Sequence, residues 1–366
     1  MNLPAVAHVA PVLGTGWPSG QILDLACGLS KAGARILVLA EEGRLAHEFA
    51  RRGVPVELAP LARRAFIDRR KLRASREVVE RFAGTAPLVV HGHGADGAGP
   101  AALLARRANA ELVLTFYDRA DARAAPPLGV ARLRAVFVHS LPAQEELVNH
   151  RGVPRQLVQL VPPGLDTERV QRRERAGWPE LPVVGALGRL EPLGGHETLL
   201  RAAAELRSRG KSFELLVAGE GPEKARLLAL ARELGLAEPV VFAGDLPGRA
   251  EFFDTVDIFV APGLRDGFGH DLLEAMARGL PILATAAGAV FEQVEDGKTG
   301  LLAPPQDAPA LAAALARYLD APDLAREVGK RAAEVVDRFP VERLVDALLE
   351  SYEHVASSGS RRLRTI

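Results

Sequence analysis

The sequence predicts an α/β protein made of two Rossmann-like domains. An apolar run at residues 6–13 leads into a glycine-bearing loop and then into a helical stripe that includes Ile22, Leu25 and Leu29, which is how a Rossmann-like unit opens. The same order of strand, loop and helix begins again at Pro182, in the segment PVVGALGRLEPLGGHETLLRAA. The length of 366 residues and the apolar content of 48% allow two buried cores.

We therefore expect a first domain over residues 1–166 and a second over residues 167–340. Residues 341–356 carry apolar side chains on one helical stripe, so a final helix is expected to cross back onto the first domain. The polar residues 357–366 are expected to form a mobile tail.

Composition excludes some classes of protein. Lys and Arg together number 46, as do Asp and Glu, so the global charge gives no case for nucleic-acid binding. Cys27 is the single cysteine; it cannot form an internal disulfide, and we expect it buried in a helix. No apolar run reaches the length that spans a bilayer, and the N-terminus resembles a strand rather than a signal peptide. We expect a cytoplasmic protein.

In the first half, apolar strands are expected at residues 35–40, 54–58, 88–90, 112–117 and 135–139. The loop after the first strand contains Gly14, Gly16 and Gly20, whose spacing does not match the G-x-G-x-x-G fingerprint, so a nicotinamide dinucleotide is disfavoured. His91 and His93 follow one strand, but two imidazoles without a third ligand make a weak metal site. They are expected to line a polar cleft or to be hydrogen-bonded within the structure, and no metal is expected.

Residues 61–81 carry eight basic and three acidic side chains. A basic amphipathic helix here could lie on an anionic membrane surface, which would make the protein peripheral on the inner face of the plasma membrane. The same pattern also fits an ordinary solvated helix face. Both interpretations remain open at the level of sequence.

In the second half, the stretch VAPGLRDGFGHDLLEAMARGLPILAT at residues 260–285 combines a strand, a glycine-rich loop and a helix. Asp266 lies in the loop and Glu274 in the helix. A helix N-terminus attracts anions, and carboxylates bind hydroxyl groups. The stretch therefore predicts a site for a phosphorylated ligand that also carries hydroxyls.

Asp266, seven intervening residues and Glu274, together with Gly188-Arg189-Leu190, resemble the signatures of GT-B glycosyltransferases, particularly the retaining family 4. The resemblance covers residues 6–355 and implies two Rossmann-like domains that face a cleft, the first on the acceptor side and the second binding the nucleotide-sugar donor. The chain departs from the family where Asp266 replaces glutamate, Gly194 replaces lysine and Tyr117 replaces histidine.

The resemblance implies a retaining glycosyltransferase of polysaccharide biosynthesis that moves a sugar from a nucleotide-diphosphate donor to a glycan or lipid-linked acceptor, without metal or bound cofactor. Arg189 and the Gly288-Ala289 loop would hold the diphosphate, Glu274 the ribose, and Asp266 the donor sugar. The other residues implied on the donor side are Gly188, Gly219, Arg265, Gly267, Phe268, Gly269 and His270, and those implied on the acceptor side are Gly14, Gly16, His91, His93 and Tyr117.

The three departures also favour an alternative, in which a GT-B protein has lost transfer activity and serves as a sugar- or nucleotide-binding or regulatory subunit. Loss of one hydrogen-bond donor to a buried phosphate is expected to cost a few kcal/mol of binding free energy. A sugar-nucleotide epimerase of GT-B architecture is less consistent with the Gly-Arg-Leu motif and the acidic pair.

Overall fold

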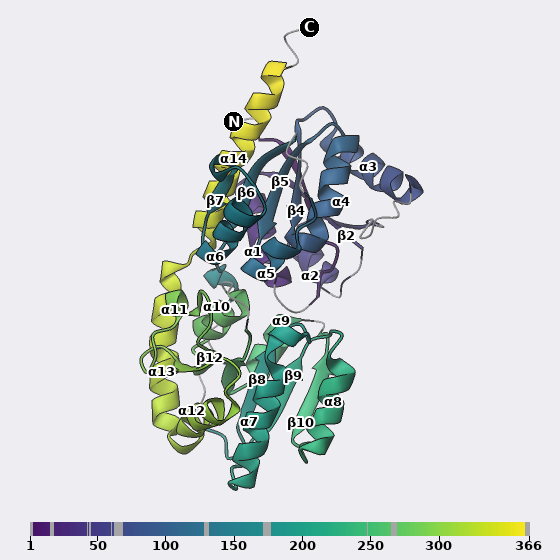
Figure 1. The fold of residues 1–366 in the computed structure, drawn as a ribbon. Coiled ribbons are helices and arrows are strands. Elements are labelled where there is room, and N and C mark those ends of the chain that lie inside the picture. The colour runs from purple at the N-terminus through teal and green to yellow at the C-terminus, as the bar shows by residue number, and fades with distance from the viewer. Residues whose placement is uncertain are drawn as a thin grey trace. The chain divides into compact units, whose positions relative to one another are not determined.

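The computed structural model describes residues 3–14, 18–41, 43, 45–59, 61, 69–127, 132–170, 177–246, 248–264 and 269–362. The chain divides into two units, which are coloured along the sequence in Figure 1. Unit 1 comprises Met1–Leu13, Gln21–Gly164 and Val341–Ile366, and unit 2 comprises Gly14–Gly20 and Leu165–Pro340. Each unit contains one parallel sheet, so the prediction of two Rossmann-like domains is confirmed.

The sheet of unit 1 has seven parallel strands in the order β3-β2-β1-β4-β5-β6-β7. Their apolar runs are buried because helices cover both faces of a parallel sheet. The strands are β1 (Ala5–Val9), β2 (Arg35–Ala40), β3 (Val56–Leu58), β4 (Leu88–His93), β5 (Glu111–Phe116), β6 (Leu133–Val138) and β7 (Val158–Leu160). β4 is longer than the sequence indicates, so both of its histidines lie within the strand.

The helices of unit 1 connect these strands and include one that comes from the far end of the chain. They are α1 (Ser19–Lys31), α2 (Ala46–Arg51), α3 (Arg69–Ala83), α4 (Gly94–Arg107), α5 (Arg119–Ala124), α6 (Leu141–Glu145), the π-helix η1 (Glu146–His150), the 3-10 helix η2 (Arg155–Leu157) and α14 (Val341–Arg362). Cys27 is buried in α1, as predicted. Val345 of α14 packs so closely on α1 that a Cβ at Gly28 would lie 2.6 Å from the Val345 side chain.

The sheet of unit 2 has six parallel strands in the order β10-β9-β8-β11-β12-β13. They are β8 (Val183–Leu187), β9 (Glu214–Ala218), β10 (Val240–Gly244), β11 (Ile258–Ala261), β12 (Ile282–Thr285) and β13 (Leu301–Ala303). The chain moves outward from β8 to β10 and then returns to the other side of β8 with β11. This reversal creates a topological switch point, where open α/β sheets bind ligands at the carboxyl ends of their strands.

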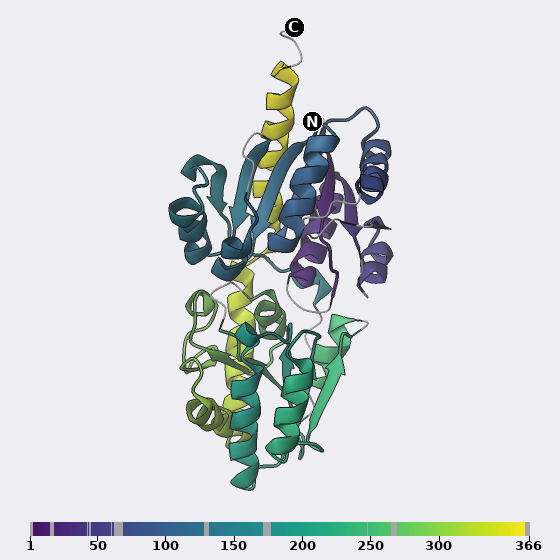
Figure 2. The ribbon, with the colours of Figure 1, turned by 45° about the vertical axis from the view of Figure 1, so that its right-hand side comes forward.

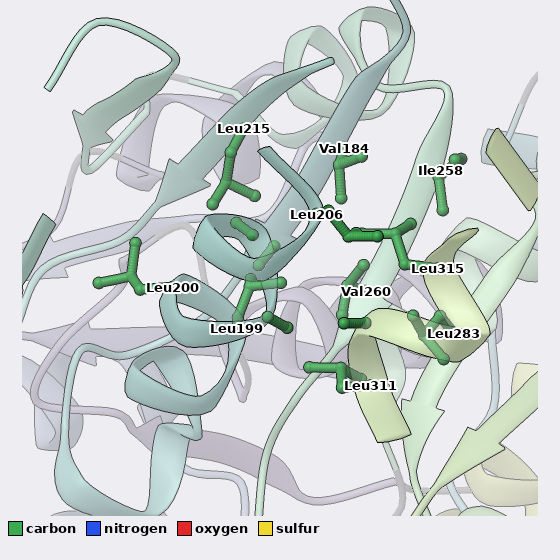
Figure 3. Close-up of a cluster of buried hydrophobic side chains, with 14 of the residues drawn as sticks. Val184, Leu199, Leu200, Leu206, Leu215, Ile258, Val260, Leu283, Leu311 and Leu315 are labelled. Carbon is green, nitrogen blue, oxygen red and sulfur yellow. The ribbon is translucent and has the colours of Figure 1, made fainter. Parts of the chain in front are cut away.

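The core of unit 2 lies between its sheet and the helices α7 (His196–Ser208) and α12 (Ala308–Asp320). Leu199, Leu206 and Leu315 of these helices are buried with Val260 and Leu283 of β11 and β12 (Figure 3). α7 packs beside α8 (Lys224–Glu233), and Figure 2 shows the two helices next to each other. The remaining helices are η3 (Thr167–Arg169), η4 (Pro192–Gly194), α9 (Arg249–Thr255), α10 (His270–Ala277), α11 (Val290–Gln293), α13 (Pro322–Val335) and η5 (Val336–Arg338).

Among the helices that the structure describes, none combines the length and the apolar character needed to cross a bilayer. The final helix α14 continues to Arg362, past the expected limit at residue 356, and residues 363–366 lie outside the described part of the chain.

Candidate active site

The loops after β8, β9 and β11 meet at the switch point of unit 2 with their backbones in close contact. A Cβ at Gly219 would lie 1.9 Å from the Gly188 carbonyl oxygen, and a Cβ at Gly195 would lie 1.7 Å from the Pro262 carbonyl oxygen. Gly219 and Gly195 also have φ angles of 134° and 71°, which L side chains rarely adopt. The loops can approach this closely only because these positions are glycine.

Arg189 follows Gly188 in the loop after β8. Its side chain is 59% exposed, and its Nε lies 3.6 Å from a carboxylate oxygen of Glu191. An exposed ion pair of this kind contributes about 0 to 1 kcal/mol. The guanidinium can therefore exchange this partner for an anion, and its fork of N–H donors suits a phosphate.

Gly194, where the family has lysine, is a tightly packed position. A Cβ there would lie 2.7 Å from Nδ1 of His196 and 2.8 Å from the backbone oxygen of Arg189. His196 is buried and begins α7, and burial lowers the pKa of its imidazole to about 4. A side chain at position 194 would therefore have to displace the backbone carbonyl of Arg189, the residue that supplies the cation.

The segment of Arg265, Asp266, Gly267 and Phe268 lies outside the described residues. On its far side, Gly269 precedes α10 and is held by the buried side chain of Gln293. The Gly269 N–H donates to Gln293 Oε1 at 3.4 Å, and Gln293 Nε2 donates to the Gly269 carbonyl at 3.2 Å. Gln293 therefore positions the end of the predicted anion loop, a role that an isolated glutamine in the sequence does not reveal.

Glu274 lies inside unit 2 and is fully buried. Arg169 donates to its two carboxylate oxygens at 3.1 and 3.3 Å, Arg249 donates to it at 2.9 Å, and Arg278 lies 3.6 Å away. Burial alone would raise the pKa of Glu274, but the charges of Arg169 and Arg249 outweigh it and hold that pKa well below its usual range. The sequence predicts that Glu274 lies on a helix face open to a ligand. In the structure, the guanidinium groups of neighbouring arginines surround its carboxylate.

Arg249 is the largest completely buried side chain in the described part of the chain. It joins Glu274 to Asp271, to which it donates at 2.6 Å, and its guanidinium lies 5.7 Å over the Phe253 ring. Burial acts to lower its pKa, and the two carboxylates more than compensate and raise it. Sequence reasoning missed Arg169 and Arg249, although an acidic residue on an apolar helix stripe signals that a cation must lie nearby.

Other residues implied on the donor side lie around the same sheet edge. Gly288 has a φ of 55° in the loop after β12, and Ala289 precedes the short helix α11. His270 is buried at the first position of α10. Gly14 groups with unit 2, where its Cβ position lies 3.5 Å from the Asp245 carboxylate, whereas Gly16 lies outside the described residues.

A pocket of about 340 Å³ borders the loop that carries Arg189. Its lining includes Glu191, Gly195, Glu197, Arg226 and Leu264. Glu197 and Arg226 neutralise each other through an ion pair of 2.7 Å.

Unit 1 gathers three buried histidines that come from neighbouring strands. His8 of β1 is opposite His91 of β4 in the strand register, and nitrogen atoms of His8, His91 and His93 lie within 4.8 Å of one another. His8 Nδ1 lies 2.8 Å from His93 Nε2, and His93 Nδ1 lies 2.7 Å from the Tyr117 hydroxyl. A single hydrogen-bonded chain thus runs from β1 through β4 to the end of β5.

The third imidazole that sequence reasoning lacked is therefore present in His8. Hydrogen bonds nevertheless occupy both nitrogens of His91, to Tyr352 and Thr115, and both nitrogens of His93. Burial lowers the pKa of His8 to about 3 and places the pKa values of His91 and His93 well below the usual range. These side chains form a neutral network, and the absence of a metal stays a prediction.

Tyr117 replaces the family's histidine at the end of this network. Burial, with a smaller contribution from Asp121, raises the pKa of the Tyr117 hydroxyl well above its usual value. The side chain is therefore a neutral hydrogen-bonding group and carries no charge near neutral pH.

The basic segment at residues 61–81 is described only in part. The side chains of residues 62–72 lie outside the described set. In the described part of α3, Arg73 and Arg76 pair with Glu77 and Glu80, at 2.8 and 3.4 Å. Val79 packs into the core.

Solved structures resemble this arrangement over almost the whole chain. The Anabaena protein HepE in complex with UDP and glucose has a TM-score of 0.78 at 19% identity, over 96% of this chain and 99% of that one. Sucrose-phosphate synthase from Thermosynechococcus elongatus has a TM-score of 0.73 at 22% identity, over 97% of this chain and 100% of that one. At these identities the likeness establishes the GT-B fold.

Family comparisons decide the membership. Residues 169–335 match the glycosyl transferases group 1, and residues 20–169 match glycosyltransferase family 4. The chain belongs to the family 4-like GT-B glycosyltransferases. The two family matches together extend through both Rossmann-like units.

Curated relatives within the glycosyltransferases share about a third of the aligned residues. D-inositol 3-phosphate glycosyltransferase of Nocardia farcinica is 32% identical over 61% of this chain and 53% of its own length. A GDP-mannose-dependent phosphatidylinositol monomannoside mannosyltransferase of Mycolicibacterium smegmatis is 35% identical over 48% of this chain and 50% of its own length. The chain thus spans about half the length of the curated relatives it matches.

Proposed function

We propose that the protein is a glycosyltransferase that moves a sugar from a nucleotide-diphosphate donor to a hydroxyl group of its acceptor, with retention of configuration. The observation that carries the proposal is the exposed Arg189 at the switch point of unit 2, where three glycine loops converge. Family membership supplies the reaction class. Retention of configuration is carried over from the resemblance to family 4.

In this proposal, the residues of unit 2 act through charge and hydrogen bonding. Arg189 neutralises the diphosphate that leaves, and Gly288 with Ala289 offers backbone N–H groups to it. Glu274 binds the ribose and Asp266 contacts the hydroxyls of the donor sugar. Stabilisation of the leaving diphosphate by fixed donors lowers the barrier to cleavage of the sugar–phosphate bond.

The acceptor is proposed to be a glycan or a lipid-linked molecule with a hydroxyl nucleophile. The names of relatives include inositol phosphate and phosphatidylinositol mannoside acceptors, and a 2-deoxystreptamine glucosyltransferase of Streptomyces kanamyceticus is 31% identical over 56% of each chain. These acceptors share a hydroxylated six-membered carbocycle. A panel of cyclitols and their phosphates is therefore the first to test, followed by lipid-linked glycans.

The donor site can be tested by thermal shift with UDP, GDP and their sugars. We expect at least one to raise the melting temperature of the wild-type protein, and Arg189→Ala to abolish most of that shift. Arg326→Ala is the matched control, because its guanidinium is 48% exposed and pairs with Asp323 at 2.9 Å on a distant helix. If no nucleotide stabilises the wild type, the proposed donor site is wrong.

Transfer is then measured with the stabilising donor and the acceptor panel, by mass spectrometry of the products. Sugar transfer that Arg189→Ala reduces by about 100-fold or more supports an enzyme, as expected when a transition-state charge partner is lost. Nucleotide binding without transfer or hydrolysis would instead favour the non-catalytic binding subunit that Tyr117 and Gly194 suggest.

A peripheral contact with anionic membranes through residues 61–81 is proposed as well, because this segment carries eight basic side chains. Flotation with vesicles of phosphatidylcholine alone and with added phosphatidylglycerol tests it. Binding that requires phosphatidylglycerol and is lost at high salt supports the contact. Equal recovery with both vesicles would show a solvated helix face instead.

A further inference from the structure

Gln293 joins two loops that come from different parts of unit 2. It is the last residue of α11, which follows the loop of Gly288 and Ala289. Its side-chain amide reaches Gly269, the residue before α10, and bonds both backbone groups of that residue: the Gly269 N–H donates to Oε1 at 3.4 Å, and Nε2 donates to the Gly269 carbonyl at 3.2 Å. Two strand residues that face each other exchange the same pair of bonds. Gln293 thus ties the start of α10 to the loop after β12.

The amide of Gln293 lies beside an apolar contact between the same two segments. Val290 of α11, Val294 after it and Leu272 of α10 are buried in one cluster. Gln293 itself is 2% exposed. A buried amide without partners is costly, so the arrangement that bonds Gly269 is the favourable one for this side chain.

The loop before α11 offers backbone N–H groups to a ligand. The N–H groups of Gly288 and Ala289 donate no hydrogen bond within the described part of the chain. Gly288 is left-handed, with a φ of 55°, and Ala289 has a φ of −78°. Successive N–H groups in such a turn form a concave nest that binds anions. Where this nest stands relative to α10 depends on the contact that Gln293 makes.

We propose that Gln293 is a positioning residue for the leaving diphosphate, because it fixes the nest of Gly288 and Ala289 against the start of α10. This inference rests on the function proposed above. Gln293 acts through the backbone of Gly269 and does not itself contact the diphosphate. Without its amide the two segments can shift relative to each other, and donors that lose their fixed places bind a diphosphate less tightly.

Two variants separate the hydrogen bonds of Gln293 from its shape. Gln293→Met keeps the length of the side chain and removes both bonds. Gln293→Glu keeps an oxygen that accepts from the Gly269 N–H, but it can donate to the Gly269 carbonyl only while its carboxyl group is protonated. Gln144→Met makes the same exchange at a buried glutamine of unit 1 and is the matched control.

The affinity for UDP is measured by isothermal titration calorimetry at about pH 8 and about pH 5, on either side of the range where a buried glutamate takes up its proton. GDP replaces UDP if GDP is what stabilises the wild type. Each variant is compared with the wild type at the same pH, because the phosphates of the ligand also titrate.

We expect Gln293→Met to weaken UDP about tenfold at both pH values, the factor that corresponds to one hydrogen bond. Gln293→Glu should bind UDP more weakly than Gln293→Met at the higher pH, because an ionised carboxylate cannot donate and repels the phosphates. At the lower pH it should bind more tightly than Gln293→Met and approach the wild type. Gln144→Met should match the wild type throughout.

The recovery of Gln293→Glu distinguishes positioning from packing. Loss of charge repulsion alone would bring this variant only to the affinity of Gln293→Met, and a packing defect would persist at both pH values. If Gln293→Met binds UDP as tightly as the wild type, or if Gln293→Glu does not pass Gln293→Met at the lower pH, the positioning role is overturned and the proposed function stands. Failure of the wild type to bind UDP or GDP overturns both.

Discussion

His91 Nδ1 lies 2.5 Å from the Tyr352 hydroxyl, although 261 residues separate the two in the chain. The bond ties α14, the last helix, to the central strand β4 of unit 1. Tyr352 is completely buried, and burial raises the pKa of its hydroxyl well above the usual value. The final helix is therefore an integral part of the unit 1 core.

The first prediction concerns this bond. Tyr352→Phe leaves a ring nitrogen of His91 buried without its partner, which costs about 1–3 kcal/mol. We expect unfolding in urea at a lower midpoint, with loss of α14 protection in hydrogen exchange. Ser357→Ala changes an exposed residue of the same helix and should have no measurable effect. A Tyr352→Phe variant as stable as the wild type would show that another group satisfies His91.

The second prediction concerns pH. The buried histidines of unit 1 stay neutral when folded, and the pKa of His8 is about 3, but in the unfolded chain they take up protons below about pH 6.5. The unfolded state then binds more protons, so stability falls as the pH is lowered from about 6.5 towards 3. One such histidine contributes a slope of about 1.4 kcal/mol per pH unit.

Urea unfolding measured between pH 7 and pH 5 tests this slope. His8→Phe should flatten it by roughly one histidine's share, about 1.4 kcal/mol per pH unit. Replacement of the exposed His150 by Phe serves as the comparison, because its side chain is 58% exposed. A slope that His8→Phe leaves untouched would mean that His8 takes up its proton in the folded state as well.

The third prediction concerns Arg249. Its replacement by Gln removes the buried ion pair with Asp271 and one of the cations that hold Glu274. Loss of one partner from a buried ion pair typically costs about 3–5 kcal/mol of folding free energy. We expect an early unfolding transition of unit 2, barely affected by salt because the cluster is buried. Arg326→Gln, at an exposed pair, should cost less than about 1 kcal/mol. Similar effects for the two variants would mean that the buried cluster contributes no more than a surface pair.

The fourth prediction concerns Gly194, where the family has lysine. A Cβ here meets the Arg189 backbone oxygen at 2.8 Å, so Gly194→Ala and Gly194→Lys should both be destabilised by about 1–3 kcal/mol. If the restored lysine contacts the phosphates, Gly194→Lys should bind pyrophosphate more tightly than Gly194→Ala does, as measured by titration calorimetry. Equal binding by the two would show that position 194 does not face the phosphates.

Much of the fold could be predicted from the sequence, because its signals are local. Buried parallel strands are continuous apolar runs, so residues 35–40 coincide with β2, and Ser140 caps α6 by accepting from the Ala143 amide, as its position before a helix indicates. The sequence predicts that the second domain begins at residue 167, and residues 171–176, which follow η3, lie outside the described set. The boundary falls between Gly164 and Leu165, beside the bridge from Leu165 to Pro340.

The candidate site was only partly predictable, because its partners come from distant segments. Arg169 and Glu274 are 105 residues apart, and Gln293 reaches back 24 residues to Gly269. Neither spacing follows a helical or strand period, so pattern reasoning gave no reason to pair them. His8 was missed for the same cause: only strand pairing sets β1 next to β4.

By itself, the sequence determined the two Rossmann-like units, the glycine loops at the strand ends and the family, because hydrophobic periodicity and short motifs depend only on residues that are close together in the chain. Only the tertiary structure decided the environment of each functional side chain. It placed Arg189 in solvent and Glu274 inside a shell of arginines, and it turned two isolated histidines into a network of three. Burial and charge pairing depend on neighbours that folding brings together, and these neighbours set whether a carboxylate is open to a ligand or already occupied.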